Sequence, residues 1–165
     1  MNANRKALEK ELDKLSINKE YNFARVLSHT KKHFDEWCMS NLSKEGYPDM
    51  KAGYMAFLMN IGSEGITNND LAKKIRVTKQ AMSKTSKELQ RLDLIELTPN
   101  PNDARSSLIA LTMRGMKMVI HARQKVNKLT EKYVEVLGQK KYIDTLDCLN
   151  KMIQVHIAIE DGQSD

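Results

Sequence analysis

Aromatic residues, prolines and cysteines are all scarce in this sequence of 165 residues. Aromatic side chains make up 5% of it, and it contains three prolines and two cysteines. Two cysteines, Cys38 and Cys148, are too few for a disulfide framework. No apolar run approaches the roughly 18 residues that a membrane helix needs, and the opening MNANRKALEKELDKL lacks the apolar centre of a signal peptide. We therefore expect a cytoplasmic protein without a membrane partner.

Signatures of catalysis are also missing. We find no glycine-rich phosphate loop, no nucleophile–base–acid set and no paired carboxylates in a suitable pocket setting. His29 and His33 have a spacing that can chelate zinc, and Cys38, His121 or His156 could add ligands, but no Cys/His cluster of recognised spacing exists. The sequence thus predicts no enzyme, no cofactor and no metal site.

Positive charge, by contrast, is concentrated in one stretch. The chain has a net charge of +6, and the segment 71–91 alone contains seven basic residues and a single acid, Glu88. An excess confined to one short segment is typical of a face that binds a polyanion. The seven basic residues are Lys73, Lys74, Arg76, Lys79, Lys84, Lys87 and Arg91.

The spacing of apolar residues predicts a mainly α-helical protein with one β-hairpin. Thr67, Thr78 and Thr112 are well placed to cap the helices that follow them. Two alternating stretches, LIELTP and SLIALT, predict a hairpin closed by NPNDARS. Helical periodicity covers residues 18–42, 51–61, 68–75 and 79–91, and two long segments after Thr112 that Gly138 separates.

Two short helices, a tight turn and a basic hairpin make a winged helix-turn-helix. We expect the apolar residues of the segment 69–92 to pack on the body of the protein: Leu71, Ala72, Ile75, Val77, Met82 and Leu89. The opposite side of the second helix carries side chains that suit a DNA major groove, since Gln can pair with adenine, Lys with guanine or phosphate, and Ser or Thr with either. These side chains are Thr78, Lys79, Gln80, Ser83, Lys84 and Lys87.

From about Asn18 to Ile157 the chain resembles the MarR family of bacterial transcriptional regulators. The resemblance includes the wing motif Asp-x-Arg, here Asp103 to Arg105, and the Leu-Thr-x-x-Gly that opens the next helix, here Leu111 to Gly115. It implies a homodimer whose N- and C-terminal helices interlock and whose recognition helices enter major grooves. It also implies that Arg105 enters the adjacent minor groove and that Asp103 orients the wing.

Two positions depart from the family pattern. Arg76 stands where a glycine is common in the helix-turn-helix turn, and Asp93 replaces a second common glycine before the wing. Left-handed backbone at such positions is tolerated by Asp better than by most residues, and would cost an Arg of order 1 kcal/mol.

We divide the chain, within a single structural domain, into four parts. Residues 1–17 form an N-terminal helical extension, 18–45 and 113–160 form dimerisation helices, and 48–112 form the winged helix-turn-helix. The apolar stripes of the terminal helices are longer than the central lobe can cover, which favours burial against a second copy.

The sequence therefore predicts a cytoplasmic, nucleoid-associated regulator, most often a repressor in this family, that binds a palindromic operator in double-stranded DNA as a homodimer. A small-molecule or stress signal would modulate it. The alternative is a winged-helix protein-interaction or redox/metal sensor module that does not read an operator directly. Seven residues are candidates for an effector pocket, although core packing explains them as well: His29, His33, Trp37, Tyr54, Met55, Met59 and Met116.

Overall fold

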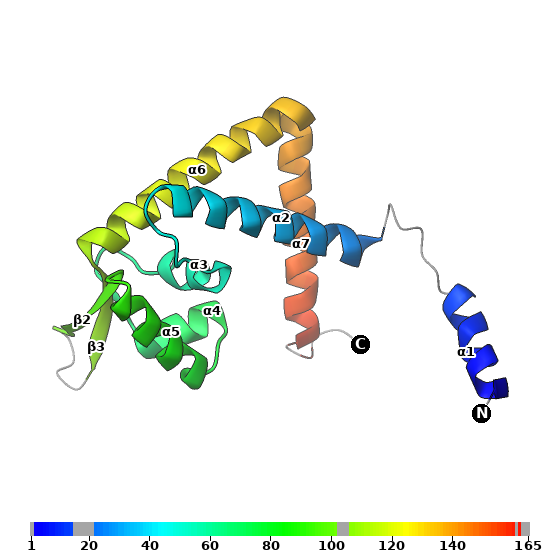
Figure 1. The fold of residues 1–165 in the computed structure, drawn as a ribbon, viewed down its shortest axis with the longest axis horizontal. Helices are drawn as coiled ribbons and strands as arrows, with labels where there is room; N and C mark the ends of the chain where they lie inside the picture. Colours follow the sequence, from blue (N-terminus) through cyan, green and yellow to red (C-terminus); the bar gives the residue numbers. More distant parts are fainter. Residues whose placement is uncertain (1, 15–21, 102–105, 161, 163–165) are drawn as a thin grey trace.

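The structure is a computed structural model that describes residues 2–14, 22–101, 106–160 and 162. It is mainly helical with a small antiparallel sheet, as the sequence predicts (Figure 1). The order is α1 (Asn2–Lys14), α2 (Phe23–Lys44), α3 (Ala52–Leu58), β1 (Ile66–Thr67), α4 (Asn68–Ile75), α5 (Lys79–Arg91), β2 (Ile95–Pro99), β3 (Ser107–Leu111), α6 (Met113–Leu137) and α7 (Gln139–Glu160).

Threonine side chains begin three of these helices. The Thr67, Thr78 and Thr112 side chains accept hydrogen bonds from the backbone N–H three residues on, at the starts of α4, α5 and α6. Each bond satisfies one of the N–H groups that a helix leaves unpaired at its first turn. All three predicted caps are confirmed.

The sheet has the order β1-β3-β2 with antiparallel neighbours. The predicted hairpin pairs Ile95 with Leu111 and Pro99 with Ser107. The sequence did not predict β1, which is only two residues long and pairs Ile66 with Ile109. This third strand attaches the wing to the start of α4.

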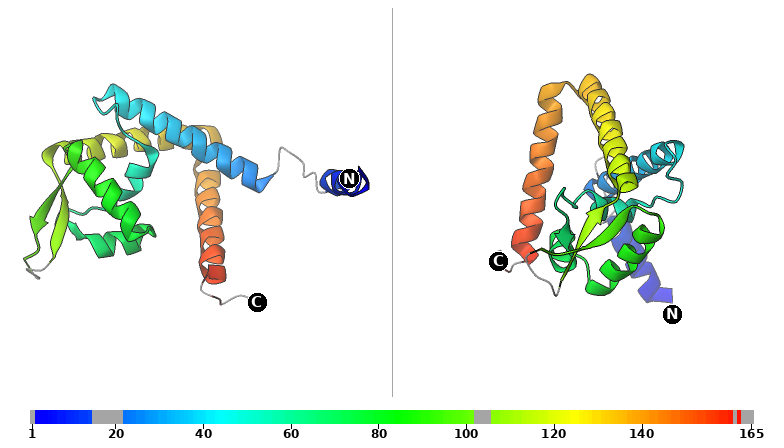
Figure 2. Two further views of the ribbon diagram at one scale, coloured as in Figure 1. Left: turned by 60° about the horizontal axis from the view of Figure 1, so that its bottom comes forward. Right: turned by 90° about the vertical axis from the view of Figure 1, so that its left-hand side faces the viewer.

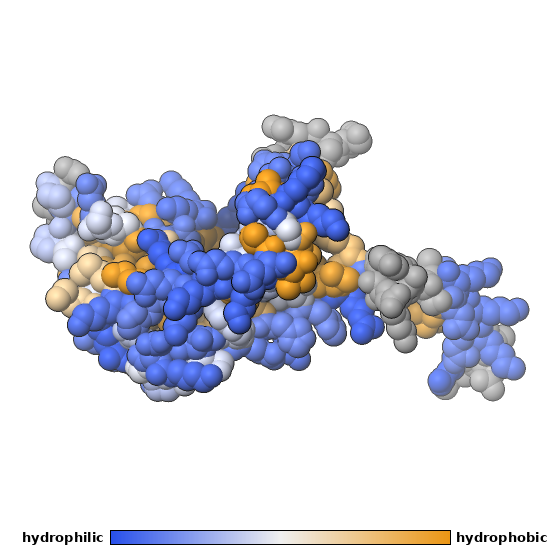
Figure 3. Space-filling model, turned by 90° about the horizontal axis from the view of Figure 1, so that it is seen from above, coloured by the Kyte–Doolittle hydropathy of each residue, from blue (hydrophilic) through white to orange (hydrophobic). Residues whose placement is uncertain are grey.

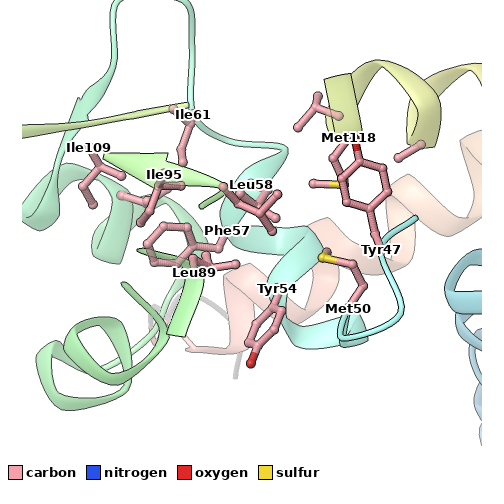
Figure 4. Packing of buried hydrophobic residues seen from close by; sticks show 14 of the residues in the cluster. Tyr47, Met50, Tyr54, Phe57, Leu58, Ile61, Leu89, Ile95, Ile109 and Met118 are labelled. Carbon is pink, nitrogen blue, oxygen red and sulfur yellow. The ribbon is translucent and has the colours of Figure 1, made fainter. Parts of the chain in front are cut away.

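One hydrophobic core joins α3, α4, α5 and the sheet to the end of α2 and the first half of α6. In Figure 4, Phe57, Leu58, Leu89, Ile95 and Ile109 meet at its centre. The largest fully buried side chains are Leu42, Phe57, Leu58, Leu71, Leu89, Leu94, Ile109 and Met118. This core holds the lobe that carries α5.

The long helices lie outside this lobe. α6 runs away from the sheet, the chain turns at Gly138 with a φ of 77°, and α7 returns across α2 rather than along it (Figures 1 and 2). No residue of α7 is buried. The described α1 side chains, from Asn4 to Lys14, are exposed as well. Among the described helices, none combines the length and the apolar character needed to cross a membrane.

Two local expectations need correction. Val77 was expected to fill the helix-turn-helix turn, but it is 38% exposed. Its backbone N–H donates to the Ala72 carbonyl, and this bond closes the turn without a buried side chain. The helix expected over 18–42 is described from Phe23 and reaches Lys44, and residues 18–21 lie outside the described residues.

Candidate nucleic-acid interface

A three-residue turn sets the direction of α5 relative to α4. Arg76 takes the left-handed backbone that is common for glycine there, with a φ of 53°. Its N–H and that of Val77 donate to the Lys73 and Ala72 carbonyls, so the end of α4 is closed by backbone bonds. Thr78 then starts α5 at once.

α5 has one buried and one exposed side. Met82, Ser86 and Leu89 are buried against the core. The six side chains that the sequence assigns to the groove all lie exposed at the start and along the other side: Thr78, Lys79, Gln80, Ser83, Lys84 and Lys87. The helix therefore offers solvent a face of amide, hydroxyl and ammonium groups, the types that pair with base edges and phosphates.

Further positive charge surrounds this face. Lys73 and Lys74 are exposed on the last turn of α4. Arg76 lies between the two helices, and its Nη1 is 2.6 Å from Glu160 Oε2 at the end of α7. Both side chains are more than half exposed, so solvent weakens the attraction between them. The pair nevertheless places the side-chain carboxylate of Glu160 beside the turn that sets the direction of α5.

The wing follows α5 through a second left-handed residue, Asp93, with a φ of 56°. β2 and β3 run together to the tip, where the Asn100 side-chain amide donates to Ser106 Oγ at 2.8 Å. Asp103 and Arg105, the two predicted wing residues, lie outside the described residues. The structure thus describes the wing from its base to the hydrogen-bonded pair of Asn100 and Ser106.

A close backbone contact fixes the base of the wing to α6. Thr112 Oγ1 donates to the Asp93 carbonyl at 2.6 Å and accepts from the Gly115 N–H at 2.9 Å. Gly115 faces the Leu94 carbonyl so closely that a Cβ there would overlap it. The Leu-Thr-x-x-Gly motif therefore joins the end of α5, the wing and α6 in one rigid junction.

Sequence reasoning missed a cluster that holds α5 from behind. Tyr54 Oη on α3 donates to Glu88 Oε2 at 2.5 Å, and Lys51 Nζ lies 3.5 Å from the same oxygen. The Tyr54 hydrogen bond, followed by the Lys51 charge, lowers the pKa of Glu88. The pKa of Lys51 is raised, first by Tyr54 and then by Glu88. One signal was available, because Glu88 is the only acid in the basic segment.

The seven candidate effector-pocket residues lie in different surroundings. His29 and His33 are exposed on α2 with ring centroids 6.3 Å apart, and Trp37 is half-buried further along. Tyr54 is in the core, Met55 and Met59 pack against it, and Met116 is 43% exposed on α6. A groove of about 600 Å³ between α2 and α7 is lined instead by residues such as Phe23, Leu27, Leu149 and Met152.

Cys38 is buried on α2. That burial raises the pKa of its thiol, and Asp35 raises it further, so the reactive thiolate is disfavoured. Cys148 is exposed on α7. Among the described residues, no three His, Cys, Asp or Glu side chains gather closely enough to hold a metal ion.

Comparison with known proteins gives consistent results. A model of the MarR family matches residues 46–106. The HTH-type transcriptional regulator BilQ of Clostridium symbiosum (strain WAL-14163) is 25% identical over 145 residues, which cover 86% of this chain and 99% of BilQ.

Two similar folds were solved as DNA complexes. A MarR mutant from E. coli complexed with operator DNA is 25% identical and has a TM-score of 0.65, covering 82% of this chain and 96% of that one. The S. aureus MepR–DNA complex is 20% identical with a TM-score of 0.68, covering 82% and 98%. The segment that carries the helix-turn-helix thus matches the MarR family, and the chain is similar along nearly its whole length to a transcriptional regulator and to DNA-bound structures of this fold.

Proposed function

We propose that this protein is a homodimeric repressor that reads a palindromic operator through α5 and the wing, and that a small molecule or stress signal releases it. The observation that carries the proposal is the face of α5, where all six groove-suited side chains lie exposed. The buried Met82 and Leu89 hold the opposite side of this helix on the core. A helix held in this way can enter a major groove without leaving its own lobe.

A second copy would cover the long helices. Large apolar side chains are exposed along α7, and others gather at the start of α2 (Figure 3). Such a surface is larger and more continuous than isolated exposed residues, which favours association. The residues concerned are Phe23, Val26 and Leu27 of α2 and Ile143, Leu146, Leu149, Met152, Ile153, Val155 and Ile159 of α7.

A two-fold dimer presents two copies of α5. Recognition helices one helical repeat apart, about 34 Å, match half-sites that are themselves related by two-fold symmetry. In this proposal the wing places Arg105 in the neighbouring minor groove, with Asp103 orienting it. A ligand releases the DNA by binding more tightly to a form with a different spacing.

Fluorescence anisotropy tests the proposal with two labelled duplexes: one selected by the protein from random DNA, and a scrambled duplex of equal composition. We expect tighter binding to the selected duplex, and affinity that falls steeply between about 50 and 200 mM salt. Equal affinity for both duplexes, or no dependence on salt, would rule out operator reading. Repeating the titration with candidate ligands tests release, which a fall in affinity for the selected duplex would support.

A further inference from the structure

The cluster of Lys51, Tyr54 and Glu88 joins the recognition helix to the helix behind it. Tyr54 lies with its ring in the core, 6% exposed, and its oxygen points away from the buried cluster (Figure 4). That hydroxyl makes the 2.5 Å bond to Glu88 on α5. Lys51 Nζ lies 5.1 Å from the centre of the Tyr54 ring and 3.5 Å from the same carboxylate.

The position of Glu88 on α5 makes this contact directional. At 100° per residue, Glu88 lies on the flank of the helix, between the buried Leu89 and the exposed Lys84. The buried side consists of two apolar side chains, Met82 and Leu89, with Ser86 between them. Apolar contacts have no preferred direction, so they hold α5 on the core but select one rotation about its axis less sharply than an oriented bond does. A hydrogen bond to a carboxylate is short and oriented, and it resists such rotation.

Rotation of α5 changes the chemistry that the DNA meets. A turn of roughly 20° at a radius of several ångströms moves a side-chain tip by more than an ångström, which is enough to break a bidentate contact to a base. A contact to phosphate tolerates such a movement, because a long lysine can follow the backbone. A device that fixes rotation therefore acts on sequence discrimination more than on general affinity.

We propose that Tyr54 and Lys51 are positioning residues: by holding Glu88, they fix the rotation of α5 and so set the sequence specificity of the protein. This proposal rests on the proposed reading of an operator by α5. Neither residue needs to contact DNA, because both act through Glu88.

The variant Tyr54→Phe tests the proposal most directly. It removes one hydroxyl and keeps both the ring and the charge of the surface. We expect affinity for the selected duplex to fall about three- to tenfold, in line with the net strength of a single hydrogen bond. Affinity for the scrambled duplex should change by less than a factor of two. Equal losses on both duplexes, or no loss on either, would overturn the proposal.

Tyr47→Phe is the matched control. Tyr47 is a second buried tyrosine, whose hydroxyl reaches the Arg114 carbonyl on α6 at 3.5 Å and does not bond α5. We expect its ratio of selected to scrambled affinity to equal that of the wild type. A loss of discrimination equal to that of Tyr54→Phe would show that the effect comes from the core in general.

The double variant Tyr54→Phe/Glu88→Gln examines whether the two groups act as a pair. Glu88→Gln alone removes a negative charge beside Lys84, so we expect it to raise affinity for the scrambled duplex while it lowers discrimination. In the Glu88→Gln background, Tyr54→Phe should cause little further loss of discrimination, because the bond is already weakened. Simply additive losses would mean that the two residues act separately.

Amide hydrogen exchange in the free protein separates this proposal from the proposed function. We expect faster exchange across α5 in Tyr54→Phe than in the wild type or in Tyr47→Phe, with the buried amides of α6 unchanged. Unchanged exchange across α5 would overturn the positioning role even if the wild type reads an operator. If the wild type does not discriminate between duplexes, operator reading fails, and exchange still decides whether Tyr54 holds α5.

Discussion

At the scale of single residues, Gly115 shows why a family motif requires glycine. Its backbone lies against the Leu94 carbonyl, and the Thr112 side chain bonds to its N–H. The tight spacing does not come from an unusual backbone angle, because Gly115 has an ordinary helical φ and lies in the first turn of α6. It comes from the approach of the Leu94 backbone, which lies just before β2. A motif that looks like a helix start in the sequence is also a packing site in the structure.

We predict that Gly115→Ala destabilises the protein by about 3 kcal/mol or more, because the added methyl group must displace backbone atoms of Leu94. Urea unfolding measures the change. Gly53→Ala is the control, since Gly53 is in α3 with nothing within 4 Å of an added Cβ. That change should stabilise the protein by up to about 1 kcal/mol. Similar results for the two variants would contradict the role of the Leu94 contact.

A second residue-scale prediction concerns Lys84. We expect Lys84→Ala to weaken binding to the selected duplex about tenfold and to reduce the slope of log affinity against log salt by about 0.9 for each phosphate that the lysine no longer neutralises. Lys44→Ala, at the exposed end of α2, should leave both quantities unchanged. Anisotropy titrations at several salt concentrations measure both. An unchanged slope in Lys84→Ala would remove this residue from the interface.

At the scale of elements, α2 and α6 are tied by charge at one point. Glu45, the C-cap residue that follows α2, has Oε1 2.7 Å from Lys125 Nζ and Oε2 3.8 Å from His121 Nδ1. The Lys125 hydrogen bond and charge lower the pKa of Glu45. A folded-state pKa below the unfolded value means that the contact stabilises the protein above the unfolded pKa. That stabilisation disappears as the pH falls through the folded value.

We therefore predict that Glu45→Gln lowers the urea midpoint at about pH 7, and that the difference shrinks as the pH falls through the lowered folded-state pKa of Glu45. Urea titrations of both proteins across this range provide the measurement, and Glu9→Gln on the exposed α1 is the control. The wild type and Glu45→Gln should converge only once the pH lies below the folded-state pKa of Glu45. A constant difference across the whole range would show that the Glu45 charge is not involved.

The order of elements was predictable from the sequence because its signals are local. Three threonine caps, a change of period at Leu94 and a glycine at position 138 fixed the succession of helices and strands. β1 was missed because a strand of two residues has no periodicity, and its pairing with Ile109 depends on contacts far along the chain. Val77 was misassigned because a turn residue has no helical face to place it.

The candidate site was predictable on the side that meets solvent and not on the side that packs. The exposed polar and basic residues of α5 follow from helical spacing and charge, and both can be seen in the segment 78–91. The Tyr54–Glu88 bond joins residues 34 positions apart, and the Arg76–Glu160 pair joins residues 84 apart. Each of these contacts depends on the finished fold, so neither leaves a pattern in the sequence.

At the scale of the whole molecule, the exposed apolar face of α7 predicts that association and DNA binding are linked. We expect Ile153→Glu, a charge placed at a 52% exposed apolar position, to weaken dimerisation at least about a hundredfold. Sedimentation equilibrium measures the change. Gln154→Glu adds the same charge at the next, polar position and should affect dimerisation much less.

The same two variants test whether two copies of α5 bind the two half-sites of a palindromic operator together. Ile153→Glu should bind the selected duplex with an affinity close to that for a single half-site. In a dimer, the two linked recognition helices would give a higher overall affinity than either helix alone. Retention of full operator affinity by a monomeric Ile153→Glu would contradict the dimeric reading mode.

In a single protomer, α7 has no buried residue. In a newly made chain, association with a second copy therefore competes with unfolding and proteolysis. The rate of association depends on the concentration of the protein. We expect the thermal midpoint to rise with protein concentration and the lifetime of the chain to shorten at low expression. Abundance would then have a lower threshold, below which the protein is degraded before it can associate and bind DNA.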